Sequence, residues 1–241
     1  MTGPTDTALD PAEPHASALS GRLNRLRAGV LGANDGIVST AGLVVGVAGA
    51  AATPATVLTA GIAGTAAGAV SMALGEYVSV SSQRDTERSL LATERRELAE
   101  DPAGELAELA ALYRAKGLSE ETADTVAREL TAHDALSAHV EAELHLDPDD
   151  LAGPWQAAAV SALSFVLGAV LPLLAIALPP AAWRIPVTVV AVLVALAVTG
   201  AVSARLGGHG TRRAVLRVVL GGALGLAVTY GLGTLVGVAA G

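Results

Sequence analysis

The fold of this chain is decided by the stretch Pro54–Glu100, PATVLTAGIAGTAAGAVSMALGEYVSVSSQRDTERSLLATERRELAE. Its first part is mostly apolar and carries a single charge, Glu76, whereas its second part is rich in charged residues. Neither part contains an internal proline, and no glycine falls between Gly75 and Gly104. We therefore expect one helix of about 47 residues, roughly 70 Å long at 1.5 Å per residue. A bilayer takes about 30 Å of that length, so roughly 40 Å should project from the membrane.

Five segments of the chain are apolar and long enough to cross a bilayer. They are Ala28 to Ala52, Ala55 to Ser82, Trp155 to Leu178, Trp183 to Ala204 and Ala214 to Ala240. The first is too long for the core of a signal peptide, and no small-residue cleavage site follows it, so we expect a permanent anchor. The sequence predicts an all-α membrane protein with five transmembrane helices.

The charges are concentrated in one segment. Of the 23 acidic residues, 18 lie between Gln83 and Asp150, together with only 7 of the 15 basic residues. This distribution excludes a single soluble globular domain, a disordered protein and a nucleic-acid binder with a basic face. The chain has no cysteine, which excludes disulfides, thiolate nucleophiles and cysteine-ligated metal sites.

The predicted organisation has four parts. Residues 1–21 form a disordered tail, 22–82 hold the first two transmembrane helices, 83–150 form an acidic helical domain, and 151–241 hold the last three transmembrane helices. Within the acidic domain we expect two helices after the long one. One runs from about Ala103 to Lys116 and is ended by Gly117, and the other runs from about Ser119 to Leu146, with Ser119 as its N-cap. The domain is thus a three-helix insertion between the second and third spans.

Arginines near the span ends predict the orientation, because cytoplasmic loops carry an excess of Lys and Arg. They precede the first span, follow the second, and lie between the fourth and fifth: Arg22, Arg25, Arg27, Arg84, Arg88, Arg95, Arg96, Arg205, Arg212, Arg213 and Arg217. The N-terminus and the acidic domain are therefore expected to be cytoplasmic and the C-terminus outside. Glycine pairs four apart, such as Gly42 and Gly46, indicate close helix packing, either within one bundle or at a dimer seam.

Carboxylates in the acidic domain are spaced for shared helix faces. The pairs are Glu94 with Glu97, Glu105 with Glu108, and His139 with Glu143. Facing carboxylates and an imidazole suit Mn²⁺ or Fe²⁺, and the lack of thiolates argues against a preference for soft metals. The alternative is a solvated acidic face that binds nothing.

Two acids lie within the spans, where a carboxylate is costly and by default a candidate for function. Asp35 lies in the first span and Glu76 near the end of the second, with Met72 one turn before it. Each has a plainer explanation. Asn34-Asp35-Gly36 is also turn chemistry, Glu76 can reach the headgroups, and Met72 can simply fill space.

The strings LGANDGIVSTAGLVVGVAGA (Leu31–Ala50), AGAVSMALGEYVSVSSQRDTE (Ala67–Glu87) and SFVLGAVLPLL (Ser164–Leu174) carry a resemblance to a known family. They resemble the vacuolar iron transporter (VIT) family, in its bacterial branch, over essentially Arg22 to Gly241. The resemblance implies a homodimer of five-span chains that exports Fe²⁺, and often Mn²⁺, from the cytosol in exchange for protons, with no organic cofactor. It also implies a bacterial plasma membrane as the location.

The resemblance implies roles for individual residues. Asp35 and Met72 match the pathway residues of the family, and Glu76 is a further candidate because plant members have glycine there and a glutamate where this chain has Gly64. The cytoplasmic metal ligands match Glu94, Glu97, Glu105, Glu108 and Glu143. Plant members have a methionine pair where this chain has His139 and Val140, so an imidazole replaces a thioether here.

Two other classes of function stay open from the residues. One is a membrane-anchored metal buffer or sensor, whose spans conduct nothing, although Asp35 and Met72 would then have no purpose. The other is a ferroxidase built on Glu-x-x-Glu helices. Di-iron bundles typically add Glu-x-x-His motifs, and none occurs at the paired glutamates. The sequence therefore favours a transporter, and we expect no enzymatic activity.

Overall fold

The computed structural model describes residues 16–148, 151–208 and 210–240, and every regular element among them is a helix. The chain forms two compact units. We call the one made mainly of Ser79–Pro154 the acidic unit, and the one made of Asn24–Val78 and Trp155–Gly241 the apolar bundle. Among the described residues, five helices are long and apolar enough to cross a membrane, in agreement with the sequence.

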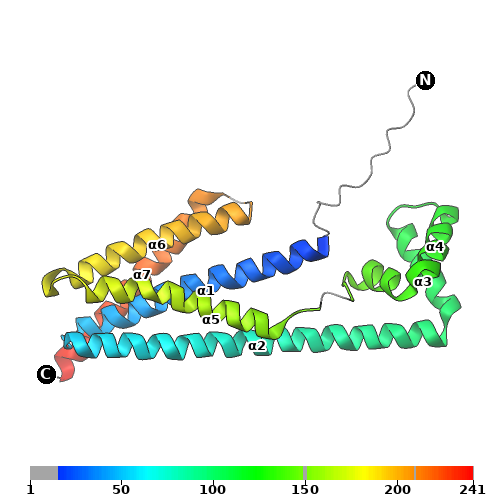
Figure 1. Cartoon of the computed structure of the whole chain (residues 1–241). Helices are drawn as coiled ribbons and strands as arrows, with labels where there is room; N and C mark the ends of the chain where they lie inside the picture. The colour runs from blue at the N-terminus through cyan, green and yellow to red at the C-terminus, as the bar shows by residue number, and fades with distance from the viewer. Residues whose placement is uncertain (1–15, 149–150, 209, 241) are drawn as a thin grey trace. The chain divides into compact units, whose positions relative to one another are not determined.

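The long helix is confirmed at its expected length. Helix α2 runs over Pro54–Glu100, 47 residues without a break, and contributes to both units (Figure 1). Thr53 precedes it as an N-cap, because its Oγ1 accepts the backbone N–H of Thr56 at 3.2 Å, and Pro54 fits the first helical position. At the other end Asp101 and Pro102 begin helix α3, since a proline cannot continue the preceding helix.

The last three spans lie close to their predicted bounds, whereas α1 begins well before the predicted span Ala28 to Ala52. These helices are α1 (Ala16–Gly49), α5 (Pro154–Ala177), α6 (Arg184–Leu206) and α7 (Thr211–Ala240), with a short 3₁₀ turn η2 (Ala181–Trp183) before α6. Helix α1 starts at Ala16, inside the tail predicted for residues 1–21. The rest of that tail lies outside the described residues, so its disorder stays a prediction.

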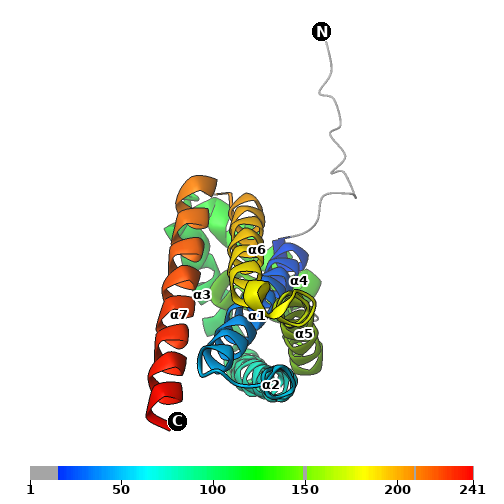
Figure 2. The same cartoon turned by 90° about the vertical axis from the view of Figure 1, so that its left-hand side faces the viewer.

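Helix α1 is the centre of the apolar bundle. Viewed end-on it lies among α2, α5, α6 and α7 (Figure 2). Its residues Ile37, Ala41 and Val45 pack against Val192 and Leu196 of α6 and against α7. Toward α5 the backbones touch: Gly32 and Gly36 face Ser161 and Phe165, and a Cβ at Gly36 would overlap the carbonyl oxygen of Phe165. Small residues allow this approach, which supplies van der Waals contact where lipid offers no hydrophobic driving force.

The acidic unit has a small core of its own. Helix α3 (Pro102–Ala115) and helix α4 (Glu120–His139) pack around Leu109, Ala110, Ala127 and Ala142. Helix α3 ends at Ala115, and Gly117 follows two residues later with a φ of 102°, which only glycine adopts readily. Ser119 is the N-cap of α4, as predicted, with its side chain accepting the N–H of Thr122 at 3.3 Å.

The expectation of one helix from Ser119 to Leu146 is wrong in its second half. Asp134 has φ −157° and ψ 97°, which breaks α4, and the end of the segment is a π-helical turn, η1 (Val140–Leu144). His145, in the left-handed conformation, terminates it. Helical propensity alone would have carried the helix through Asp134, and the hydrogen bonds of the Asp134 side chain override it.

Candidate metal site and membrane cavity

Three predicted ligands meet inside the acidic unit. Glu94 comes from α2, Glu105 from the first turn of α3, and His139 from the end of α4. Each offers one ligand atom to a group in which all atoms lie within 4.8 Å of one another. His139 Nδ1 is 3.2 Å from Glu94 Oε1 and 3.4 Å from Glu105 Oε2. His139 is fully buried and Glu94 almost so.

These contacts leave polar atoms unsatisfied. Although Nδ1 lies close to both carboxylates, neither contact has the alignment of a hydrogen bond, and Glu94 Oε1 and both ring nitrogens of His139 are buried without a hydrogen-bond partner. A buried polar group without a partner costs about 1–3 kcal/mol. A cation shared by the two carboxylates and the imidazole would satisfy these atoms.

The protonation states fit a metal site. Burial, and then the charges of Glu143 and Glu105, raise the pKa of Glu94 from 4.5 to about 7. Burial also raises the pKa of Glu105. Burial lowers the pKa of His139, against the opposing charge of Glu108, so its ring is neutral near pH 7 and has a lone pair to give. With a pKa of about 7, Glu94 is partly protonated at neutral pH, and a metal ion that binds it must displace that proton.

The remaining predicted ligands surround this group. Glu97, Glu108 and Glu143 are exposed, and all three raise the pKa of Glu94 through their charges, so they lie within electrostatic reach of it. They do not join the three ligand atoms that meet at His139. In this structure Glu94, Glu105 and His139 form an inner group, and Glu97, Glu108 and Glu143 form an exposed acidic rim.

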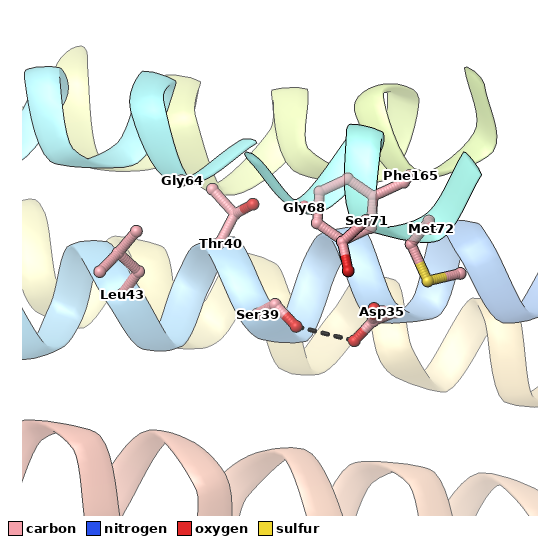
Figure 3. A pocket seen from close by; sticks show the side chains of 9 residues that line it. All are labelled: Asp35, Ser39, Thr40, Leu43, Gly64, Gly68, Ser71, Met72 and Phe165. Atoms are coloured by element: carbon pink, nitrogen blue, oxygen red, sulfur yellow. Dashed lines mark hydrogen bonds between the residues drawn. The ribbon is translucent and has the colours of Figure 1, made fainter. Parts of the chain in front are cut away.

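A second candidate site lies in the apolar bundle. A cavity of about 210 Å³ is lined by residues of α1, α2 and α5 (Figure 3). Asp35 and Met72 both line it, and the Met72 side chain points toward Asp35 (Figure 3). Asp35 is half-buried, and its Oδ1 accepts a hydrogen bond from Ser39 Oγ at 2.7 Å. Thus Asp35 is inside helix α1 and not in a turn, which removes the plainer explanation for it.

Glu76 is placed differently. It is half-buried one turn beyond Met72 on α2 and is not among the residues that line the cavity. Gly64, where plant members have a glutamate, does line it, and Leu43 fills the space that a side chain at Gly64 would need. The structure therefore gives no sign that Glu76 takes the place of that glutamate.

Sequence reasoning missed three polar residues. Ser39 holds Asp35, and its position four residues later on the same helix was a usable signal. Glu87 is buried, accepts hydrogen bonds from Gln83 Nε2 at 2.8 Å and from the N–H of Ala152 at 3.2 Å, and so ties the end of the acidic unit to α2. Asp134 breaks α4, and its Asp-x-x-Ser spacing to Ser137 was the available cue.

Comparison with known proteins assigns the family. The sequence model of the VIT family matches residues 26–234. The chain belongs to the VIT family. Its relatives include a vacuolar iron transporter of Acanthamoeba castellanii, 45% identical over 229 residues, which cover 95% of this chain and 84% of that protein. Vacuolar iron transporter homolog 5 of Oryza sativa is 39% identical over 215 residues, covering 89% and 81% of the two chains.

Membership of the VIT family decides between a transporter and an enzyme. Proteins of the VIT family are transporters and not enzymes, so the ferroxidase hypothesis is excluded. A vacuolar iron transporter homolog of Arabidopsis thaliana is 39% identical over 219 residues, covering 90% and 87% of the two chains. The relatives named here come from an amoeba and from plants. The assignment to a bacterial branch stays a prediction.

Proposed function

We propose that this VIT-family chain transports Fe²⁺ or Mn²⁺ out of the cytosol in exchange for protons. The observation that carries the proposal is the inner group Glu94, Glu105 and His139, with its buried, unpartnered ligand atoms. The names of the relatives, vacuolar iron transporters, support iron as cargo. The five apolar helices support passage through a bilayer.

The donor set of the inner group suits these ions. Two carboxylates and a neutral imidazole carry two negative charges in their ionised form, which a divalent cation balances. Oxygen and nitrogen donors accept Mn²⁺ and Fe²⁺, whereas no thiolate is available to favour a softer metal. The exposed acidic rim raises the local concentration of cations around the group.

Asp35 and Met72 form the proposed pathway within the membrane. The carboxylate binds the cation, and the Met72 thioether favours a transition metal over Mg²⁺ or Ca²⁺. One carboxylate does not hold a proton and a metal ion at the same time. That competition at Asp35 would couple outward metal movement to inward proton movement, with Glu76 as a further proton or cation site.

The remaining parts of the proposal rest on the charge pattern and on the resemblance of the sequence to the bacterial branch of the family. The acidic unit and the N-terminus face the cytoplasm and the C-terminus lies outside, as the distribution of arginines predicts. The working unit is a homodimer in a bacterial plasma membrane. It binds divalent cations, protons and lipid, with no organic cofactor and no nucleic acid.

Uptake of Mn²⁺ into vesicles carrying the purified protein tests this proposal. The parent protein should accumulate Mn²⁺, and Glu94→Gln and His139→Gln should slow uptake at low Mn²⁺ concentration because capture is weakened. Glu129→Gln removes one exposed carboxylate of the same unit outside the inner group and should leave uptake unchanged. Binding of Mn²⁺ without any uptake by the parent protein would favour the alternative of a membrane-anchored buffer or sensor.

A further inference from the structure

The break in helix α4 lies five residues before His139. At Asp134 the backbone leaves the helical region, and the Asp134 side chain then caps the next segment of the chain. Its Oδ1 accepts the backbone N–H of Ser137 at 3.0 Å, and its Oδ2 accepts the Ser137 hydroxyl at 2.8 Å. These two hydrogen bonds lower the pKa of Asp134, so the capping group is a carboxylate at neutral pH.

The segment after Asp134 also has a defined C-terminal end. Its last five residues form the π-helical turn Val140–Leu144, a form that is rare and often found at functional sites. His145 then adopts φ 54°, and the N–H of Leu146 donates to the carbonyl of Val140 at 3.3 Å. Residues 135–144 are therefore a short element with its own start and its own end, and not the fraying tail of α4.

This element is seated on the core of the acidic unit. Val140 and Ala142 are buried, and Ala142 and Ala138 pack with Leu109 and Ala110 of α3. In the sequence, His139 lies between the packed residues Ala138 and Val140, and it is fully buried. The direction of the imidazole is therefore set by where the element starts and by how it is rotated.

In an unbroken α4, the side chain of His139 would point in a different direction. Each helical residue turns the chain by about 100°, and one extended residue changes both the rotation and the axis of the helical residues after it. A break also removes backbone hydrogen bonds, which is unfavourable unless a side chain replaces them. Asp134 supplies that replacement from an exposed position, where no packing requires an aspartate.

We propose that Asp134 is a positioning residue for metal binding, which fixes the start of the 135–144 element so that His139 faces Glu94 and Glu105. The proposal rests on the proposed metal site and adds to it a residue that does not contact the ion. It predicts that the cap at Asp134 affects metal affinity through His139 alone.

The test is Mn²⁺ binding by the full chain in detergent, followed by the loss of the free-ion electron paramagnetic resonance signal. Asp134→Ala should raise the dissociation constant for Mn²⁺ about fivefold. This factor corresponds to the free energy lost when a typical N-cap is removed. Asp134→Asn should stay within about twofold of the parent, because the amide oxygen still accepts the Ser137 N–H. Ser119→Ala removes the other N-cap of α4 and should not change the affinity.

A double variant and hydrogen exchange separate positioning from general stability. In a His139→Gln background, Asp134→Ala should produce no further loss of Mn²⁺ affinity. Asp134→Ala should also speed amide exchange in residues 135–144 and leave residues 120–133 unchanged.

Three results would overturn the proposal while the metal site stands. Asp134→Ala could bind Mn²⁺ as tightly as the parent, Ser119→Ala could lose as much affinity as Asp134→Ala, or the double variant could bind more weakly than His139→Gln alone. If the parent binds no Mn²⁺, or if His139→Gln binds it as the parent does, the proposed inner group fails and the role of Asp134 fails with it.

Discussion

Glu94 is a residue at which metal binding and stability make opposite demands. Its carboxylate is almost buried, next to the unpartnered nitrogen atoms of His139 and among other acids, which raises its pKa to about 7. In the metal-free protein an ionised Glu94 is unfavourable, whereas a bound cation requires it. A residue present only for stability would not be a carboxylate here.

Glu94→Gln should separate these two demands. At about pH 8 the metal-free variant should unfold at a higher temperature than the parent, because it no longer buries a charge that its neighbours repel. Its Mn²⁺ affinity should fall at least about tenfold, the usual minimum for disturbing a metal site. Thermal unfolding and Mn²⁺ titration in detergent measure both quantities, with Glu129→Gln as the control. An affinity equal to that of the parent would remove Glu94 from the ligand set.

The pH dependence of stability and of metal affinity follows from the carboxyl group of Glu94. The pKa of Glu94 rises from 4.5 to about 7 on folding, so its contribution to stability is fully present below about pH 4.5 and is lost as the pH rises through 7. The lowered pKa of His139 acts in the opposite sense, but only below its ordinary value of 6.5.

Between about pH 6.5 and about pH 8, the metal-free protein should therefore lose stability while Mn²⁺ affinity increases. Thermal unfolding and Mn²⁺ titration across this range measure the two trends. Calorimetry in buffers of different ionisation enthalpy should show protons released on binding, fewer at the higher pH. Affinity that does not change over this interval would contradict the assignment of Glu94.

At the scale of helices, the contact between α1 and α5 depends on glycine. A Cβ at Gly36 would overlap a backbone carbonyl of α5, which has no flexible end that could move aside. Gly36→Ala should therefore destabilise the bundle by about 1–3 kcal/mol, as overpacking of a tight interface does. Gly225→Ala is the control, because nothing lies within 4 Å of its Cβ position in the described structure. Thermal unfolding in detergent distinguishes them, and equal stability of the two variants would refute the close α1–α5 contact.

The helices were predictable because their signals are local. Pro54 at the start of α2 lacks the N–H that would be unpaired there, Gly117 after α3 adopts a positive φ, and Ser119 before α4 accepts a backbone N–H. Each of these features involves only a few neighbouring residues, so a sequence pattern reveals it. The break at Asp134 was not predicted, because an aspartate is only mildly unfavourable inside a helix and its side-chain cap depends on the exact backbone around it.

The inner group was predictable only in part. The Glu94–Glu97 spacing places both carboxylates on adjacent parts of one helix face and does not say which of them is buried. A signal did exist on that helix: Glu87, Leu91 and Glu94 recur at spacings of four and three, and all three are buried. Which carboxylates meet His139 depends on the packing of α3 and α4 against α2, which no local pattern specifies.

At the scale of the whole molecule, one chain combines two candidate cation sites of different chemistry. The acidic unit offers carboxylates and an imidazole, and the apolar bundle offers a carboxylate beside a thioether. Helix α2 contributes to both, with Glu94 in the first and Met72 in the second. A buffer or sensor would need only the first site, so the choice between buffer and transporter depends on whether ions pass Asp35 and Met72.

The most direct test is Fe²⁺ and Mn²⁺ flux into proteoliposomes that carry the pure protein, with the internal pH followed by a trapped dye. We predict metal entry coupled to proton exit, and loss of both in Asp35→Asn while Mn²⁺ binding at the acidic unit is retained. Metal binding without flux under either direction of the pH gradient, or full flux in Asp35→Asn, would contradict proton-coupled transport through Asp35.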